Sequence, residues 1–344
     1  MKILYIIPEF NEGGAEYHLL NLIQGLAGEH EITLATNGGS LESLLPENVR
    51  IIHVESARKN IFTIIYAAIK LSRLNKKFCW DIIHVHSRVP AWVAWLLSSL
   101  TGVKWLMTAH ALYSLNLGLT PLKHADGIIC VSESVKNHLR KYLPANNVKI
   151  IYNGINPPEI FNNNDSQESI KFLFVGRLTG IKGLDIAIKA LSGLIKYNWT
   201  LDIIGDGSKR EELESLVKNL NLNQRVTFHG VKSKSEVKLF MSKSSCLLFP
   251  SLSEGMGLSV LEAASMRLPV IASDLPALHE ISRGGLVKAG NVDEWREAIK
   301  NFIESGEASQ IDPAKIITVN EMTRLTGKFY FTILREFTNL QATL

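Results

Sequence analysis

Two glutamates, Glu254 and Glu262, are separated by seven residues that include a pair of glycines. An apolar run ends at Pro250, the glycines follow, and a helical pattern begins near Leu258. We therefore expect Glu254 in a loop and Glu262 about one turn into a helix. A carboxylate can accept hydrogen bonds from two neighbouring sugar hydroxyls, and the free N–H groups of a helix N-terminus suit a phosphate. The alternative is that Glu262 only supports the first helical turn electrostatically.

A second glycine-rich turn carries two permanent cations. Arg177 and Lys182 lie in the stretch Gly-Arg-Leu-Thr-Gly-Ile-Lys-Gly, between an apolar run and a helical pattern that starts near Asp185. An arginine can hold phosphate oxygens through two parallel hydrogen bonds, and a lysine adds a point charge. The stretch lacks the Gly-x4-Gly-Lys-Ser/Thr order of a P-loop. The alternative is a loop at a helix start whose charges are only solvated.

Both loops belong to a series of short apolar runs, each followed by turn residues and a helical pattern. The runs are 2–7, 31–35, 51–54, 81–84, 103–108, 127–131 and 148–151, then 170–175, 200–204, 225–228, 246–250, 269–272 and 285–287. Apolar strands that alternate with helices predict parallel sheets covered on both faces. Because ligands of such sheets bind beyond the carboxyl ends of the strands, both loops are expected at a ligand site.

The chain of 344 residues is long enough for two domains. The series of runs breaks at 156–166, where two prolines precede a stretch rich in Asn and Asp, and this composition predicts a linker. We therefore predict an α/β protein with two Rossmann-like, doubly wound domains that face each other across a cleft. The predicted domains are residues 1–160 and 161–320.

Taken in order, the two loops resemble the nucleotide-sugar site of the retaining glycosyltransferases with a GT-B fold. The family is family 4, the "glycosyl transferases group 1" set, and the resemblance covers nearly the whole chain. Further matching stretches are 13–16, 84–87, 108–110, 125–133, 151–155, 204–207 and 228–231. The sequence departs from the family pattern at Met256, where an aromatic residue is common, and at Arg267, where a glycine is frequent.

The resemblance implies a role for each matching position. Arg177 and Lys182 would hold the donor diphosphate in place of a metal ion, and Glu262 would bind the ribose hydroxyls. Glu254 and the backbone N–H groups of 255–258 would hold the transferred sugar, which His110 would also contact. The implied catalytic residues are Arg177, Lys182, Glu254 and His110. The implied donor-binding residues are Gly14, Gly205, Val231, Gly255, Met256, Gly257, Leu258 and Glu262.

The resemblance also implies how the domains divide the work and what chemistry they perform. The first domain would bind the acceptor and the second the nucleotide sugar, while residues 321–344, in a helix from about 314 to 338, would pack back on the first domain. Glycosyl transfer passes through an oxocarbenium-like state, which a stabilised leaving group and a fixed sugar favour. Family members retain the anomeric configuration by same-face attack, in which the leaving phosphate takes the acceptor proton. No general base and no metal are assigned.

Histidines follow two of the apolar runs. From its own context His110 is as readily a hydrogen-bonded core residue as a site residue, and the family match favours the site. His84 and His86 alternate along one strand and are expected to face opposite sides, with one in the core, so a shared metal site is not expected. His86 is the better site candidate of the two. Asp206 and Ser132 are either site residues or plain turn and cap residues.

Composition points to a cytoplasmic protein. The net charge of +4 is too small to indicate a nucleic-acid partner. The longest uncharged apolar run, 89–100, is too short to span a bilayer, and the N-terminus reads as a strand rather than a signal peptide. The three cysteines, Cys79, Cys130 and Cys246, show neither metal-binding nor disulfide spacing, which suits a reducing compartment.

One segment departs from this even charge. Residues 58–77 hold six basic residues and no acidic one, interleaved with apolar residues at helical spacing; the basic residues are Arg58, Lys59, Lys70, Arg73, Lys76 and Lys77. A basic amphipathic helix favours an anionic membrane surface, which would place the protein peripherally on the inner face of the cell membrane. The alternative is a surface helix that packs on its own domain with a solvated basic face.

Together these features predict a metal-independent, retaining hexosyltransferase. It would move a sugar from a UDP- or GDP-linked donor to a glycan or lipid-linked acceptor, as in surface polysaccharide or lipopolysaccharide assembly. The alternatives are a nucleotide-sugar epimerase of the same fold and a non-catalytic scaffold associated with a membrane. A nicotinamide oxidoreductase is disfavoured, because no Gly-x-Gly-x-x-Gly follows a first strand.

Overall fold

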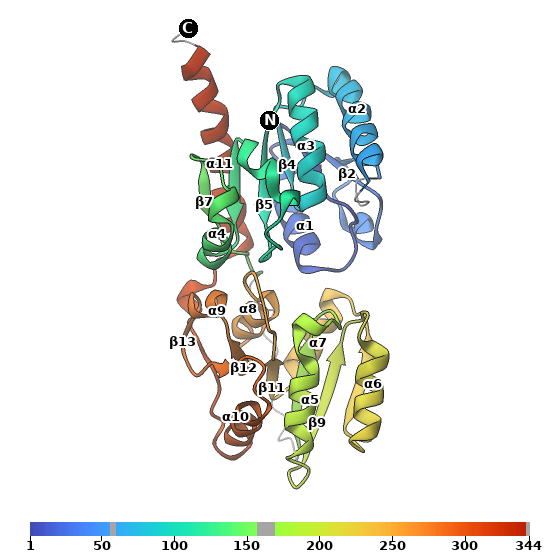
Figure 1. The fold of residues 1–344 in the computed structure, drawn as a ribbon, viewed down its shortest axis with the longest axis vertical. Coiled ribbons are helices and arrows are strands. Elements are labelled where there is room, and N and C mark those ends of the chain that lie inside the picture. Colours follow the sequence, from blue (N-terminus) through green and yellow to red (C-terminus); the bar gives the residue numbers. More distant parts are fainter. Residues whose placement is uncertain (56–59, 157–168, 342–344) are drawn as a thin grey trace. The chain divides into compact units, whose positions relative to one another are not determined.

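The computed structural model describes residues 1–55, 60–156 and 169–341, and it divides the chain into two compact units. The first unit is Met1–Gly154 together with Ile317–Leu344, and the second unit is Ile155–Ile316 (Figure 1). The boundaries predicted from the sequence lie near residues 160 and 320. Most of the predicted linker, residues 157–168, lies outside the described residues.

The first unit is built on a parallel sheet of seven strands in the order β3-β2-β1-β4-β5-β6-β7. The strands are β1 (Lys2–Ile6), β2 (Glu31–Thr36), β3 (Arg50–His53), β4 (Ile82–Val85), β5 (Lys104–Ala109), β6 (Gly127–Cys130) and β7 (Val148–Ile150). The helices before the crossing to the second unit are α1 (Gly14–Leu26), α2 (Ile61–Phe78), α3 (Arg88–Thr101) and α4 (Glu133–Leu139), with 3₁₀ turns η1 (Ser40–Leu44), η2 (Leu117–His124) and η3 (Arg140–Tyr142). Because the order reverses between β1 and β4, the ends of these two strands mark the switch point at which such sheets bind ligands.

The second unit repeats this order in a parallel sheet of six strands, β10-β9-β8-β11-β12-β14. The strands are β8 (Ile170–Val175), β9 (Trp199–Ile204), β10 (Val226–Gly230), β11 (Cys246–Phe249), β12 (Val270–Asp274) and β14 (Val287–Lys288). The helices are α5 (Leu184–Ser192), α6 (Arg210–Asn219), α7 (Lys234–Lys243), α8 (Leu258–Ser265), α9 (Pro276–His279) and α10 (Val292–Ser305), with 3₁₀ turns η4 (Gly180–Lys182) and η5 (Pro313–Lys315). The switch point of this sheet lies between β8 and β11.

The predicted fold class, two Rossmann-like α/β domains, is confirmed. Every predicted apolar run contains or overlaps a strand, because strands buried on both faces read as continuous apolar sequence. A small antiparallel pair, β13 (Ser282–Gly284) and β15 (Gln310–Ile311), was not predicted. These strands are two or three residues long and mostly polar, so they leave no apolar run to detect.

The last helix, α11 (Val319–Gln341), packs against α1 in the first unit. It begins later than the predicted residue 314, because 313–315 form the turn η5 and Thr318 caps the helix by accepting a hydrogen bond from the Glu321 N–H at 3.1 Å. Its Tyr330 is buried, and the hydroxyl lies 3.0 Å from that of Tyr5 on β1. The helix therefore contributes to the core of the first unit.

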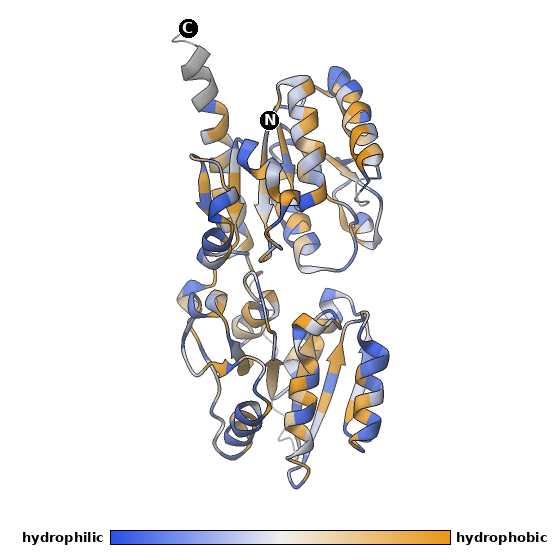
Figure 2. Ribbon diagram, in the orientation of Figure 1, coloured by the Kyte–Doolittle hydropathy of each residue, from blue (hydrophilic) through white to orange (hydrophobic). Residues whose placement is uncertain are grey.

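Helix α2 carries apolar and polar residues side by side along its length (Figure 2). Its Ile64, Ala67 and Leu71 are buried, and it packs against α3. Arg58 and Lys59 of the predicted basic segment lie outside the described residues. Among the residues that the structure describes, no helix is both long and apolar enough to cross a bilayer.

Candidate active site

The loops that follow β8, β9 and β11 are held together by their backbones in the second unit. The Gly176 N–H donates to the Ile204 carbonyl at 3.0 Å, and the Leu252 N–H donates to the Ile181 carbonyl at 2.8 Å. Gly183 has a left-handed backbone with φ of 59°, and a Cβ there would lie 2.1 Å from the Pro250 carbonyl oxygen. The glycine-rich sequence is thus what allows the loop after β8 to lie directly against the loop after β11.

This contact brings Lys182 and Glu254 together. The Lys182 Nζ donates to the Glu254 Oε1 at 2.5 Å, and the Ser251 hydroxyl donates to the same oxygen at 2.7 Å. The two charged side chains are 21% and 11% exposed, so the pair is shielded but still reachable from solvent. Two residues predicted for the site from separate loops are therefore in direct contact at the β8/β11 switch point.

The start of α8 lies beside this pair in the sequence and is shaped by Gly257. This residue precedes the helix with φ of 79°, and Met256 before it is buried. Gly255 and Gly257 are also buried, whereas Leu258 is partly exposed. The N-terminal N–H groups of an α-helix attract anions, so this turn suits a phosphate or a sugar oxygen. The guanidinium of Arg177 is exposed and, within the described part of the chain, forms no ion pair.

Glu262 is the fifth residue of α8, and its side chain pairs with Lys234 across a distance of 3.2 Å. Lys234 is the first residue of α7, which starts with a capping box formed by Ser233 and Glu236. The pair also lines a pocket that includes Met241. Glu262 thus faces a neighbouring helix, and its partner Lys234 was not predicted from the sequence. The capping box indicates a helix start at this position, but nothing in the sequence indicates that Lys234 pairs with Glu262.

Three other predicted positions lie on the loops after β9 and β10. Gly205 has φ of 128°, and a Cβ there would lie 2.0 Å from the Gly176 carbonyl oxygen, so the loops after β8 and β9 also touch. Asp206 accepts a hydrogen bond from the Gly207 N–H at 2.7 Å and pairs with Arg210 at 3.1 Å, as a turn residue does. Val231 is 57% exposed at the end of β10.

The two departures from the family pattern leave the local backbone intact. The buried Met256 occupies the apolar position before Gly257. Arg267 itself takes the left-handed conformation, with φ of 58°, at the position where a glycine is frequent. Arg267 therefore forms the turn after α8 in a left-handed conformation that strains the backbone of any residue with a Cβ.

In the first unit the sequence-predicted residues are Gly14 and His110. Gly14 is the exposed first residue of α1, and His110 follows β5 and is partly exposed. Ser132 is the N-cap of α4, where its hydroxyl accepts a hydrogen bond from the Val135 N–H at 3.1 Å. The N-terminus of α1 and the ends of β4 and β5 belong to the switch region of the first sheet.

The prediction that His84 and His86 face opposite sides is wrong. Residues two apart on a strand share a face, and the two ring centroids are 4.3 Å apart. Both nitrogens of His84 are engaged, one with the Tyr330 hydroxyl at 2.6 Å and the other with the Thr108 hydroxyl at 2.8 Å. His86 lies 3.1 Å from His110, measured from Nδ1 to Nε2. The expectation that the histidines share no metal site rested on this error.

Burial keeps these imidazoles neutral. Loss of solvation lowers the pKa of His18, on α1, to about 4. The same cause, with repulsion between neighbouring histidines, lowers the pKa values of His84, His86 and His110 well below their usual range. At neutral pH the first unit therefore presents uncharged donors and acceptors at its switch region. His18 was not predicted from the sequence because it lies inside an apolar helical pattern.

Comparison with known proteins identifies the family. Residues 12–159 match the family described as Glycosyltransferase Family 4, and residues 156–315 match that described as Glycosyl transferases group 1. An uncharacterized glycosyltransferase of Methanocaldococcus jannaschii is 33% identical over 313 residues, 86% of each chain. The O-antigen biosynthesis glycosyltransferase WclY of Escherichia coli is 29% identical over 307 residues, 82% of each chain.

Solved structures share the fold. A glycosyltransferase of Rickettsia africae has a TM-score of 0.81 at 24% identity, covering 97% of this chain and 98% of its own. The HepE protein of Anabaena in complex with UDP-glucose has a TM-score of 0.75 at 19% identity, covering 100% of both chains. At identities this low the solved structures establish only the fold, whereas the sequence matches establish the enzyme class. The chain belongs to the family 4 glycosyltransferases and has their GT-B fold.

Proposed function

We propose that the protein is a retaining, metal-independent hexosyltransferase that uses a UDP- or GDP-linked sugar as donor. The observation that carries the proposal is the contact of Lys182 with Glu254 at the β8/β11 switch point, with the exposed Arg177 in the same loop as Lys182. This arrangement supplies cations for a diphosphate and a carboxylate for sugar hydroxyls within one unit. The complex of HepE with UDP-glucose and the O-antigen role of WclY support this donor class and a glycan acceptor.

In the proposed reaction the bond between the sugar C1 and the donor phosphate oxygen breaks while the acceptor oxygen bonds to C1 on the same face. The acceptor proton passes to the departing phosphate oxygen, so the protein supplies no general base. Arg177 and Lys182 neutralise the negative charge that grows on the leaving diphosphate. Glu254 fixes the hydroxyls of the transferred sugar, and His110 contacts that sugar through an uncharged imidazole.

Glu262 binds the ribose in this proposal, and the N-terminal turn of α8 accepts an oxygen of the donor. The free protein already neutralises both glutamates with lysines, at 2.5 Å for Lys182 and 3.2 Å for Lys234. On donor binding, Lys182 then exchanges its glutamate contact for the diphosphate, and the two glutamates exchange their lysine contacts for sugar hydroxyls. Because the cations are built into the chain, a chelator is expected to leave turnover unchanged.

The test begins with a panel of UDP- and GDP-sugars, scored for hydrolysis and for thermal stabilisation of the protein. With the active donor, Lys182→Ala and Glu262→Ala are each expected to lower turnover at least tenfold, about 1.4 kcal/mol or more in transition-state stabilisation. Lys189→Ala is the matched control, since Lys189 also forms an ion pair, with Asp185 at 2.8 Å, but on the exposed side of α5.

Turnover of Lys182→Ala equal to that of the parent protein would refute the site. Release of an epimerised sugar nucleotide in the absence of any acceptor would favour the epimerase alternative. Both results are read from the same product analysis, and circular dichroism of each variant confirms that the fold is kept.

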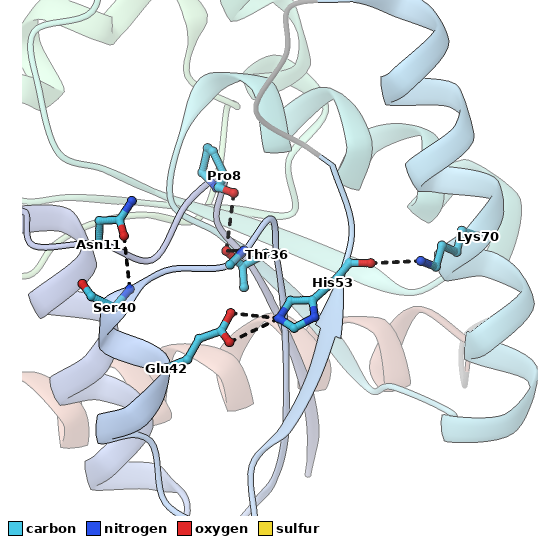
Figure 3. A network of polar contacts seen from close by, with 8 residues as sticks. Pro8, Asn11, Thr36, Ser40, Glu42, His53 and Lys70 are labelled. Carbon is cyan, nitrogen blue, oxygen red and sulfur yellow. Dashed lines mark hydrogen bonds and ion pairs between the residues drawn. The ribbon is translucent and has the colours of Figure 1, made fainter.

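A second proposal concerns the acceptor. We propose that α2 lies on an anionic membrane surface, where a lipid-linked acceptor is found. Its first turns expose Phe62 by 77% and Tyr66 by 62%, and its last turns expose Arg73, Lys76 and Lys77. Exposed aromatic and basic side chains on one helix are the combination that binds an anionic bilayer interface. Lys70 differs from these residues, because its Nζ donates a hydrogen bond to the His53 carbonyl at 2.9 Å (Figure 3). The ring of the same histidine is bonded to Glu42.

Binding to vesicles with anionic lipids is expected to weaken with salt and to be lost when Lys70, Arg73, Lys76 and Lys77 are neutralised. The matched control neutralises three exposed lysines of the second unit, Lys189, Lys196 and Lys218. Phe62→Ser is expected to weaken binding without changing its salt dependence. Unchanged vesicle binding after removal of the four α2 charges would reject this surface.

A further inference from the structure

Three imidazoles from three separate elements converge in the first unit. His18 lies on α1, His86 follows β4 and His110 follows β5, and one nitrogen from each falls within 4.8 Å of the other two. His18 and His86 are buried, and His110 is partly exposed. The cluster thus has a closed interior and one member that solvent can reach.

The hydrogen bonds of this cluster show which ring nitrogens are engaged. The His18 Nδ1 lies 2.9 Å from the Asn153 Oδ1, an acceptor, so the ring donates there and its Nε2 carries the lone pair. The His86 Nδ1 is bonded to the His110 Nε2, and the His86 Nε2 is buried with no hydrogen-bond partner among the described residues. The His86 Nδ1 and the His110 Nε2 share one proton in this bond, so both can bind an ion once that proton moves to the other nitrogen of its ring.

We propose that His18, His86 and His110 form a binding site for a divalent transition-metal ion such as Zn²⁺. Imidazole nitrogen is a preferred ligand of Zn²⁺, whereas Mg²⁺ and Ca²⁺ prefer oxygen. The Asn153 contact to His18 is the kind of outer contact that orients a metal-bound histidine.

The geometry needs only small side-chain movements to hold the ion. Zn–N bonds of about 2.0–2.1 Å place neighbouring tetrahedral ligands about 3.3 Å apart. The His86 and His110 nitrogens are already 3.1 Å apart, so the His18 ring makes most of the adjustment. Three protein ligands leave a fourth position for water, and the partly exposed His110 provides the access route. His84 is not a ligand, since both of its nitrogens are bonded elsewhere.

An ion bound at the three histidines is expected to affect sugar transfer, and this expectation rests on the proposed function. If His110 contacts the transferred sugar, an ion bound to His110 removes that contact. Zn²⁺ is then an inhibitor that competes with the donor sugar, which is compatible with a reaction that needs no metal. The inhibition is expected to disappear together with metal binding in His18→Gln, which keeps the His110 contact.

The experiment measures binding directly, on the full chain without an affinity tag. A Cys79→Ser background removes the exposed thiol, which is an alternative metal ligand. Titration with Co²⁺ is expected to give the intense visible absorption of a tetrahedral site at one ion per chain, and Zn²⁺ is expected to displace it. His18→Gln and His110→Gln are expected to abolish the absorption, and Asn153→Ala to weaken binding about tenfold. His30→Gln, which changes a partly exposed histidine of the same unit outside the cluster, is the matched control.

Absence of tetrahedral absorption, or equal Co²⁺ binding by His18→Gln and the background protein, would overturn the site. Melting temperatures without metal show whether each variant is folded, and His110→Gln, at the exposed edge, covers the case in which His18→Gln unfolds. The absorption does not depend on transfer, so it decides the site even if no donor sugar is found. Metal binding without inhibition of transfer would reject the competitive role alone.

Discussion

The two units arrange their strands in the same order, yet their switch points carry different chemistry. In the second unit the ends of β8 and β11 bring a lysine and a glutamate into contact, with the charged groups partly open to solvent. In the first unit the corresponding region holds buried imidazoles kept neutral by loss of solvation. The shared topology fixes where a ligand is bound, and the loop residues decide which charge that ligand can carry.

The difference follows from how each unit approaches its switch point. The loops of the second unit touch through glycines, and the charged side chains of Lys182 and Glu254 stay partly open to solvent. The histidines of the first unit are packed against Tyr5 and Tyr330, where a charge is costly. A negatively charged leaving group therefore suits the second unit, and an uncharged sugar suits the first.

Acid is expected to separate the two units most strongly. The pKa of His18 falls from about 6.5 in the unfolded chain to about 4 in the folded one, so the unfolded chain binds more protons between these values. The contribution of the neutral His18 to the free energy of unfolding is fully present above about pH 6.5 and is lost as the pH falls to about 4. The loss is about 3 kcal/mol. His84, His86 and His110 act in the same direction.

Hydrogen exchange at pH 7 and pH 5 measures this effect for each unit. The amides of β1, β4 and β5 are expected to lose protection at pH 5 while those of β8 and β11 keep it. Equal loss in both units would contradict the assignment of the acid-sensitive groups to the first.

The next prediction concerns the close approach of Gly183 to Pro250, which brings together the two loops of the candidate site in the second unit. Gly183→Ala is expected to lower the free energy of unfolding by about 3 kcal/mol and to reduce transfer, because a Cβ there meets the Pro250 carbonyl at 2.1 Å and φ is left-handed. Gly306→Ala is the matched control, since Gly306 has φ of 74° and open space around it. It is expected to cost only about 1 kcal/mol, the strain alone. Equal effects in urea unfolding would show that the loop contact is unimportant.

The sequence predicted the strands and the charged loops better than the contacts between them. Apolar runs and glycine-rich turns are local patterns, so the amino-acid sequence alone is enough to place both switch regions. The partner of Glu262 could not be placed in this way, because Lys234 lies on a different helix and ion pairs across a fold leave no spacing rule. Glu254 and Lys182 were both predicted for the site, but their direct contact depends on the packing of two loops.

The histidine cluster shows the same limit more sharply. His110 was identified through its position after an apolar run, whereas His18 is hidden in the buried face of α1. Three chain segments must fold before their imidazoles meet, so no local pattern predicts the cluster. For His84 and His86 the local pattern is sufficient, since alternation along a strand places residues two apart on one face.

The ion pairs Lys182–Glu254 and Lys234–Glu262 are expected to differ in their effect on kcat. Lys234→Met is expected to raise the KM for the donor by no more than about fivefold with kcat unchanged, because a partly exposed ion pair contributes about 1 kcal/mol or less. Lys182→Met, at the pair that meets the diphosphate, is expected to lower kcat as well. Steady-state kinetics of the two variants under the same conditions make the comparison. A loss of kcat in Lys234→Met would place Lys234 in the reaction itself.

The smallest expected effect tests whether the turn after α8 is a strained element of the site. Arg267 holds φ of 58° with a Cβ, which costs about 1–2 kcal/mol, and a glycine removes that strain while adding freedom to the unfolded chain. Arg267→Gly is therefore expected to raise the free energy of unfolding by about 0.5 kcal/mol with turnover unchanged. Arg267→Ala keeps the Cβ and removes only the charged side chain, so it is expected to leave stability as it is. If both variants stabilise the protein equally in urea unfolding, the side chain of Arg267 rather than its backbone is the unfavourable feature.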